Sequence, residues 1–228
     1  MPSPAPAHRA TSVPRLVLAS ESPQRAAILE RLGVSFLARP AHVPELGEGE
    51  PEWVASENAL RKARAGRRRG ELVLGCDTLV VLHGVIYGKP AHQAHARDTL
   101  QALSGHTHEV LSGLALLGPE EGRERLALAR TAVAFRELSP ELLSWYLATG
   151  EWRGRAGGYA IQGAGAALVR GIEGDYENVV GLPVAALLDM APELLSRPEL
   201  LSRPELLSAG DERVKERDDG GDDRVKEL

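Results

Sequence analysis

The sequence predicts an α/β fold, because short apolar runs that suit strands alternate with amphipathic stretches that suit helices. The clearest example is 16–33, where the run Leu-Val-Leu leads directly into apolar residues at helical spacing. A second is 72–87, where two β-rich runs are joined by His83-Gly84, a pair that suits a two-residue hairpin turn. With 228 residues, the chain is long enough for one compact unit with a large core.

The stretch 16–33 also carries polar residues between its predicted strand and helix. Ser22 before Pro23 is a typical helix start, and Gly33 is a typical residue just beyond a helix end. Ser20 precedes this start and Arg25 falls in the first turn, where free N–H groups and the helix dipole favour an anion. The pattern indicates a phosphate cradle, although Ser-x-Ser-Pro can also act as a helix cap alone. The glycine spacing of a Walker loop is absent.

The other predicted elements follow from the spacing of apolar residues and from the glycine, proline and polar residues that separate the apolar runs. We expect strands at 34–38, 72–87, 106–117, 125–135 and 166–169, helices at 51–66, 92–103, 140–150 and 183–190, a polar loop at 41–50, and a glycine-rich loop at 154–163 that leads into a short strand. Asp77 lies in the middle of the apolar run 72–87, where an ionised carboxylate needs a partner or a metal. It is therefore a candidate functional residue.

Composition excludes several classes of partner. The net charge is −5 and only 4% of residues are aromatic, so the chain lacks the basic field and stacking rings that nucleic-acid binding needs. The single cysteine, Cys76, allows no internal disulfide and suits a reducing compartment. No apolar run is long enough to span a bilayer, and the N-terminus lacks the apolar core of a signal peptide. We therefore expect a cytoplasmic protein that binds neither nucleic acid nor membrane.

The two ends of the chain differ in composition from the middle. Residues 1–14 are rich in Pro, Ala and Ser, which predicts a flexible arm. In the segment 192–228, the sequence PELLSR recurs at 192–197 and 198–203, which predicts a low-complexity extension. The folded domain is expected to cover 15–191.

Two histidine pairs raise the alternative of a zinc site. His92 and His95 are three apart on a predicted helix, and His106 and His108 are two apart on a predicted strand. Each pair could share a metal, but no third ligand accompanies either at a suitable spacing. Surface roles, and for His108 a structural hydrogen bond, are therefore favoured.

Five motifs in order give the chain a resemblance to the Maf family of nucleoside triphosphate pyrophosphatases, over roughly 16–190. They are Ser-x-Ser-Pro at 20–23, Gly-Cys-Asp-Thr at 75–78, Gly-Lys-Pro at 88–90, Leu-Ser-Gly-x-Thr-His-Glu-Val at 103–110 and Ala-Gly-Gly-Tyr-x-Ile-Gln-Gly at 156–163. The resemblance implies an α/β fold with a long mixed sheet and flanking helices, forming two lobes around a cleft, and usually a homodimer. It implies hydrolysis of a nucleoside triphosphate to the monophosphate and diphosphate with a divalent cation, Mg²⁺ or Mn²⁺. Some members clear non-standard nucleotides, and the family has been linked to septum formation.

The resemblance also implies roles for individual residues. Asp77 matches the family's proton acceptor and, with Glu45, the acidic residues near the metal. The other matches are Ser20, Arg25, Lys62 and Lys89 for substrate binding, and Gln24, Thr78 and Gln162 at positions tied to a preference for dTTP and UTP.

Two alternatives stay open, and one further residue departs from the family pattern. Gln24 stands where the pyrimidine-preferring members carry arginine, which leaves room for a purine or modified base such as 7-methyl-GTP. Arg155 stands where lysine is common, which keeps a cation but changes its hydrogen-bonding geometry. A nucleotide-binding regulator of cell division with vestigial hydrolysis is the alternative from another class of protein.

Overall fold

The computed structural model describes residues 16–195; the predicted arm 1–14 and residues 196–228 of the predicted extension lie outside this range. The strands are β1 (Leu16–Leu18), β2 (Phe36–Ala38), β3 (Leu72–Leu82), β4 (Val85–Tyr87), β5 (Thr107–Leu117), β6 (Glu124–Phe135) and β7 (Val169–Glu173). The α-helices are α1 (Pro23–Arg31), α2 (Pro51–Gly66), α3 (Gln93–Leu103), α4 (Pro140–Thr149), α5 (Tyr176–Val180) and α6 (Val184–Met190), and the 3₁₀ turns are η1 (Ala156–Gly158), η2 (Ala164–Leu168) and η3 (Pro192–Leu194). None of the described helices is long and apolar enough to cross a membrane.

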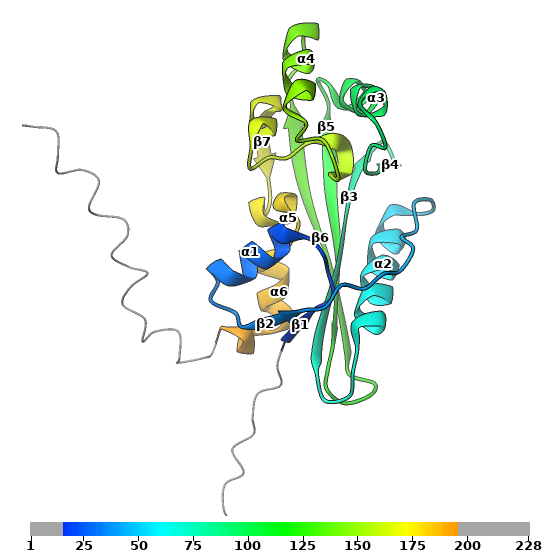
Figure 1. The fold of residues 1–228 in the computed structure, drawn as a ribbon, viewed down its shortest axis with the longest axis vertical. Helices are drawn as coiled ribbons and strands as arrows, with labels where there is room; N and C mark the ends of the chain where they lie inside the picture. Colours follow the sequence, from blue (N-terminus) through cyan, green and yellow to red (C-terminus); the bar gives the residue numbers. More distant parts are fainter. Residues whose placement is uncertain (1–15, 196–228) are drawn as a thin grey trace, which may run out of the picture. The chain divides into compact units, whose positions relative to one another are not determined.

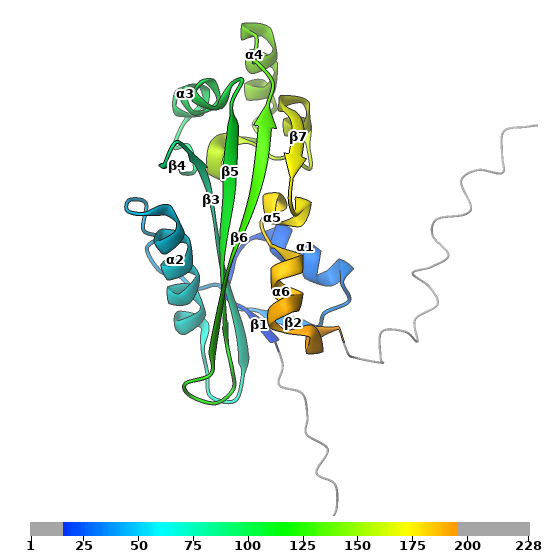
Figure 2. The ribbon, with the colours of Figure 1, turned by 180° about the vertical axis from the view of Figure 1, so that it is seen from behind.

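The strands form one mixed sheet in the order β2-β1-β3-β5-β6-β7, with β4 paired to β3. The pairs of β1 with β2 and β3 are parallel, and the others are antiparallel. Helix α2 covers one face of the long strands, while α1, α5 and α6 lie on the other, and α3 and α4 pack toward the far end of these strands (Figure 1, Figure 2). The predicted α/β fold with a long mixed sheet and flanking helices is confirmed.

Strand β3 has an interruption in pairing along one edge. β1 pairs with its residues 72–74 and β4 with its residues 80–82, while β5 pairs with its opposite edge from 73 to 81. Within residues 16–195, no strand therefore pairs with 75–79 on the edge shared by β1 and β4. Asp77 and Thr78 lie in this gap, so the sheet itself leaves their backbone edge open.

Two glycines allow α2 to lie directly on the sheet beside this gap. A Cβ at Gly75 would stand 2.1 Å from the Ala59 carbonyl oxygen, and one at Gly113 would stand 2.2 Å from the Ala55 carbonyl oxygen. Gly113 is the residue of β5 that pairs with Asp77. The small residues on both surfaces bring the α2 backbone close to β3, and with it the polar side chains that α2 carries.

We expect Gly113→Ala to lower the free energy of unfolding by about 3 kcal/mol, because the added methyl group meets helix backbone that cannot move aside locally. The matched control is Gly171→Ala in β7, where a Cβ would have no atom within 4 Å and the change should cost less than about 1 kcal/mol. Urea unfolding of both variants measures the difference. Similar losses in the two would mean that the close approach of α2 contributes little.

The structure corrects the expected strand at 166–169. Residues up to Leu168 form the 3₁₀ turn η2, and β7 begins only at Val169. The reason is close packing: a Cβ at Gly165 would be 2.5 Å from the Ala160 carbonyl oxygen, and the turn is closed by a hydrogen bond from the Ala166 N–H to the Gly163 carbonyl. Gly163 thus leads into this turn and not into a short strand.

Other boundaries follow the sequence more closely. His83 and Gly84 have φ values of 51° and 77°, as the predicted two-residue hairpin requires. Helix α5 is too short to show a period in the sequence and was not among the expected elements; the Asp175 carboxylate caps it by accepting from the Glu177 N–H at 2.8 Å. Leu194 in η3 is buried with the core around β1 and α6, so residues 192–195 also pack with this unit.

Candidate functional site

A cavity of about 700 Å³ opens at the gap in β3. Its lining comes from the β1–α1 loop and the first turn of α1, the loop before α2, α2 itself, β3, the segment after β4, the 150–163 segment and the end of α5. All nine predicted site residues line it: Ser20, Gln24, Arg25, Glu45, Lys62, Asp77, Thr78, Lys89 and Gln162. Residues that lie far apart in the sequence are therefore brought to one cavity.

A buried ion pair lies at the base of this cavity. The Lys62 ammonium donates to Asp77 Oδ1 at 2.5 Å and to Glu45 Oε1 at 2.6 Å. Asp77 is 4% exposed and Lys62 is 7% exposed, so neither charge is well hydrated. The Lys62 ammonium, shared by two carboxylates, offsets the cost of burying Asp77 and Lys62.

Asn58 is a part of the site that the sequence reasoning missed. Its side-chain N–H₂ donates to Asp77 Oδ2 at 2.9 Å, while its Oδ1 accepts from the Leu46 N–H at 2.8 Å. Asn58 thus joins the catalytic candidate to the loop that carries Glu45. The signal was available, because Asn58 lies four residues before Lys62 and therefore on the same face of a predicted helix.

Glu45 connects both lysines of the site. Its Oε2 accepts from the Lys89 ammonium at 3.1 Å, while its Oε1 is bonded to Lys62. Burial alone would raise the pKa of Glu45, but the hydrogen bond and charge of Lys62, together with Lys89, lower it to about 2. The Glu45 carboxylate is therefore ionised across the physiological range.

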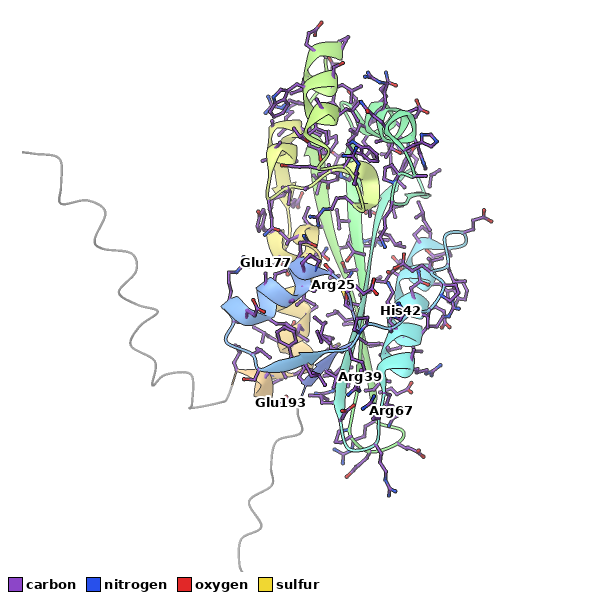
Figure 3. The ribbon with its side chains drawn as sticks, viewed as in Figure 1. Arg25, Arg39, His42, Arg67, Glu177 and Glu193 are labelled. Carbon is purple, nitrogen blue, oxygen red and sulfur yellow. The ribbon has the colours of Figure 1, made fainter. Side chains whose placement is uncertain are left out.

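Arg25 extends from α1 (Figure 3), and acceptors of the protein itself hold its guanidinium. Its Nε donates to the Gly181 carbonyl at 2.8 Å, and its two terminal nitrogens donate to Ser20 Oγ at 2.9 Å and Thr78 Oγ1 at 3.2 Å. Ser20 Oγ also accepts from the Ser22 N–H at 3.2 Å, which leaves the Ser20 hydroxyl proton free to be donated. Arg25 therefore holds the Ser20 hydroxyl before α1 and the Thr78 hydroxyl on β3.

Gln24 and Gln162 differ in exposure and in hydrogen bonding. Gln24 is half-buried, and its Oε1 accepts from the Ser22 hydroxyl at 3.1 Å. Gln162 is exposed, and no side-chain hydrogen bond joins it to the described part of the chain. Its amide is thus available to a ligand.

The carboxylates of Asp77 and Glu45 suit a site for a hard divalent cation such as Mg²⁺. Asp77 and Glu45 present hard oxygen atoms around the same lysine, and Mg²⁺ is commonly bound by one or two carboxylates together with substrate phosphates. Within residues 16–195, no three His, Cys, Asp or Glu side chains are grouped to hold a metal by themselves. The donor set therefore fits a divalent cation that arrives with a phosphorylated ligand.

The histidine pairs have other partners. His92 Nδ1 accepts from the His95 N–H as the cap of α3, and the His106 ring bonds to the Ser104 carbonyl oxygen. The His108 ring bonds to the Tyr159 hydroxyl at 2.9 Å and packs edge-on against Phe135. Burial lowers the pKa of His108 to about 4, so this ring is neutral at pH 7.

Acidification is expected to destabilise the fold through His108. Its pKa rises from about 4 in the folded protein to its ordinary value of 6.5 on unfolding, so stability falls as the pH drops from 6.5 toward 4. Between pH 7.5 and 5 this group should account for about 2 kcal/mol. His108→Gln keeps a hydrogen-bonding group for Tyr159 without the titration, so urea unfolding at both pH values should show a smaller loss in the variant. An equal loss in both proteins would contradict the assignment.

The cavity combines a buried carboxylate, two lysines held by a second carboxylate, a donor hydroxyl and the N-terminal turn of a helix. Cations and N–H groups suit an anionic ligand, and helix N-termini bind phosphate in particular. The fold and cavity therefore define an α/β protein with a site for a phosphorylated ligand.

Comparison with known proteins identifies the family. The family described as Maf-like protein matches residues 15–194. A dTTP/UTP pyrophosphatase from Anaeromyxobacter sp. (strain Fw109-5) is 48% identical over 182 residues, which cover 77% of this chain and 87% of the relative. Proteins of the same name from Moorella thermoacetica and Pyrococcus furiosus are 47% and 42% identical over 180 residues, each covering 77% of this chain and 93% of the relative. The chain belongs to the Maf family.

Proposed function

We propose that this protein hydrolyses nucleoside triphosphates, with dTTP and UTP as the preferred substrates, to the monophosphate and diphosphate. The observation that carries the proposal is the Asp77–Lys62 pair, 2.5 Å apart at the base of a cavity lined by further cations. The relatives named dTTP/UTP pyrophosphatase, at 41–48% identity over most of their length, support the substrate. A site of this kind would use its charges both to bind the triphosphate and to stabilise the transition state.

The reaction needs a positioned water and stabilised phosphate oxygens. Asp77 would orient the attacking water and accept its proton, since Asn58 and Lys62 hold the carboxylate in place. Lys62 and Lys89 would neutralise charge on the phosphates, and the Ser20 hydroxyl would donate to a phosphate oxygen. Arg25 would keep Ser20 in position for this contact.

A divalent cation fits beside these groups. Members of the Maf family are generally metal-dependent, and Asp77 and Glu45 would hold Mg²⁺ or Mn²⁺ here. Such an ion supplies charge neutralisation on phosphate oxygens as the bond to the leaving group breaks. Glu45 is ionised at neutral pH, as a metal ligand must be.

Gln162 would recognise the nucleobase of the substrate, and Gln24 and Thr78 also line the cavity. An amide presents both a donor and an acceptor, which suits the edge of uracil or thymine. The Thr78 hydroxyl is already hydrogen-bonded to Arg25 and, at 2.9 Å, to the Ser112 hydroxyl. Thr78 would therefore affect substrate preference through the shape of the cavity wall more than through a hydrogen bond to the nucleobase.

Release of diphosphate by the purified full chain tests the proposal. The panel is dTTP, UTP, 7-methyl-GTP and ITP, each with Mg²⁺, with Mn²⁺ and with a chelator. We expect release from dTTP and UTP that stops with the chelator. Faster turnover of 7-methyl-GTP or ITP would replace the pyrimidine assignment, and triphosphate binding without release from any nucleotide would favour the regulator of cell division.

Two further expectations accompany this function: a homodimer, which the family resemblance implies, and a cytoplasmic location, which the composition predicts. A homodimer predicts twice the chain mass of 24.5 kDa in light scattering of the purified protein. A cytoplasmic location predicts that the protein fractionates with cytoplasmic markers in its own cells.

A further inference from the structure

Arg155 differs from the other cations of the cavity in having its side chain unengaged. Lys62 and Lys89 are paired with carboxylates, and Arg25 donates to three groups. The Arg153 guanidinium lies over the Trp152 ring, 4.6 Å from its centre. Within residues 16–195, no hydrogen bond or ion pair is formed by the Arg155 guanidinium, although this residue is half-buried and lines the cavity. A half-buried cation without a partner suits an anionic ligand.

The backbone around Arg155 is firmly placed. The Arg155 carbonyl accepts from the Gly158 N–H at 3.0 Å, closing η1. Gly157 has φ 67° and packs on Val80, where a Cβ would be 2.8 Å from the nearest methyl carbon. Since a side chain would be strained there and would clash, this glycine holds the turn against β3. Arg155 is therefore presented by a rigid turn.

The turn lies beside the segment that carries Lys89. The Gly157 N–H donates to the Gly88 carbonyl oxygen at 3.1 Å, so the backbone of η1 is bonded to the residue before Lys89. The neighbouring carboxylate, Glu151, forms no ion pair with Arg155 and accepts instead from the Gly165 N–H at 3.4 Å. Arg155 thus adds to the cavity wall a positive charge that Glu151 does not neutralise, on a turn bonded to the segment that carries Lys89.

The charged groups follow an order from the interior to the surface. Asp77 and Lys62 are the most buried, Glu45 links Lys62 to Lys89, and Lys89 has a side chain that is 54% exposed. In the proposed reaction the α-phosphate lies at Asp77, where water attacks. Lys89 and the turn that carries Arg155 lie on the more exposed side of this order, where the β- and γ-phosphates would then extend.

We propose that Arg155 is a substrate-binding residue that holds the β- and γ-phosphates, the part of the triphosphate that leaves as diphosphate. This rests on the proposed function, since it places the leaving group on the Lys89 side of the cavity. The guanidinium can bind two phosphate oxygens at once, which a lysine ammonium cannot do with the same geometry.

Isothermal titration of the purified full chain with inorganic pyrophosphate, and separately with dTMP, in the presence of Mg²⁺ tests the proposal without requiring turnover. Arg155→Ala and Arg155→Gln should each weaken pyrophosphate binding by about tenfold and leave dTMP binding unchanged. Arg155→Lys should recover part of the loss. The matched control is Arg170→Ala, because Arg170 is exposed on β7 and does not line the cavity; it should change pyrophosphate binding less than about twofold.

Unchanged pyrophosphate binding in Arg155→Ala, absence of pyrophosphate binding to the wild-type chain, or an equal loss for dTMP would each overturn the role of Arg155. Failure of the proposed function is a separate result, because it appears as wild-type protein that releases no diphosphate from any nucleotide of the panel. Far-ultraviolet circular dichroism of each variant identifies any loss that comes from misfolding.

Discussion

Asp77→Asn should lower the rate of diphosphate release by about a hundredfold to ten-thousandfold while leaving the protein folded. The amide has nearly the same size as the carboxylate but cannot accept a proton from water. Lys62 keeps its bond to Glu45 in the variant, so the ammonium does not lose every partner. Asn58 can donate to the amide oxygen as it donates to Asp77 Oδ2.

The steady-state rate with dTTP and Mg²⁺ measures this effect, and circular dichroism with urea unfolding checks the fold. Asp98→Asn is the matched control, because Asp98 is an exposed aspartate on α3 and does not line the cavity. It should keep the wild-type rate. A fully active Asp77→Asn protein would remove Asp77 from the chemistry and leave only a structural role for the buried pair.

Three of the candidate site residues could be predicted from the sequence alone, because they lie at an element boundary or break a local pattern. Ser20 and Arg25 lie at a helix start and Asp77 interrupts an apolar run, whereas Lys62 and Lys89 are predicted only by the family resemblance. Such positions are unfavourable or unnecessary for packing alone, so their side chains stand out. All of them line the cavity at the gap in β3.

The partners of these residues could not be predicted in the same way. Arg25 bonds to the Gly181 carbonyl, 156 positions along the chain, and no local pattern encodes that contact. The sequence predicts a strand at 166–169 where the structure has η2, because the close contact between Gly165 and the Ala160 backbone exists only in the folded protein. Local sequence therefore indicates which side chains are candidates for the site, and tertiary packing decides which groups each of them contacts.

The fold explains why Asp77 can be both buried and accessible. Its side chain points to the α2 face, where Lys62 and Asn58 meet it, while the missing strand partner opens the β3 edge to the cavity. A strand that continued from β1 to β4 would close this edge. The gap in the sheet is therefore the feature that turns a structural ion pair into a candidate active site.

Lys62 has two roles in this arrangement, and they can be separated. It neutralises the buried Asp77 carboxylate, which stabilises the fold, and it faces the cavity, where it would bind phosphate. Removing one partner of a buried pair leaves the other charge uncompensated, which typically costs more than removing both. The fold should therefore tolerate the double loss better than the single one.

Lys62→Met should lower the free energy of unfolding by about 3 kcal/mol, and adding Asp77→Asn should restore a large part of it. Diphosphate release should be lost in both proteins, by more than about a hundredfold, because the double variant lacks the base as well as the cation. Urea unfolding and the release assay, applied to the wild type, both single variants and the double variant, form a complete cycle. Losses of stability that simply add would contradict the pairing at 2.5 Å as the reason for the effect, whereas recovered stability without recovered activity would assign the pair to both the fold and the chemistry.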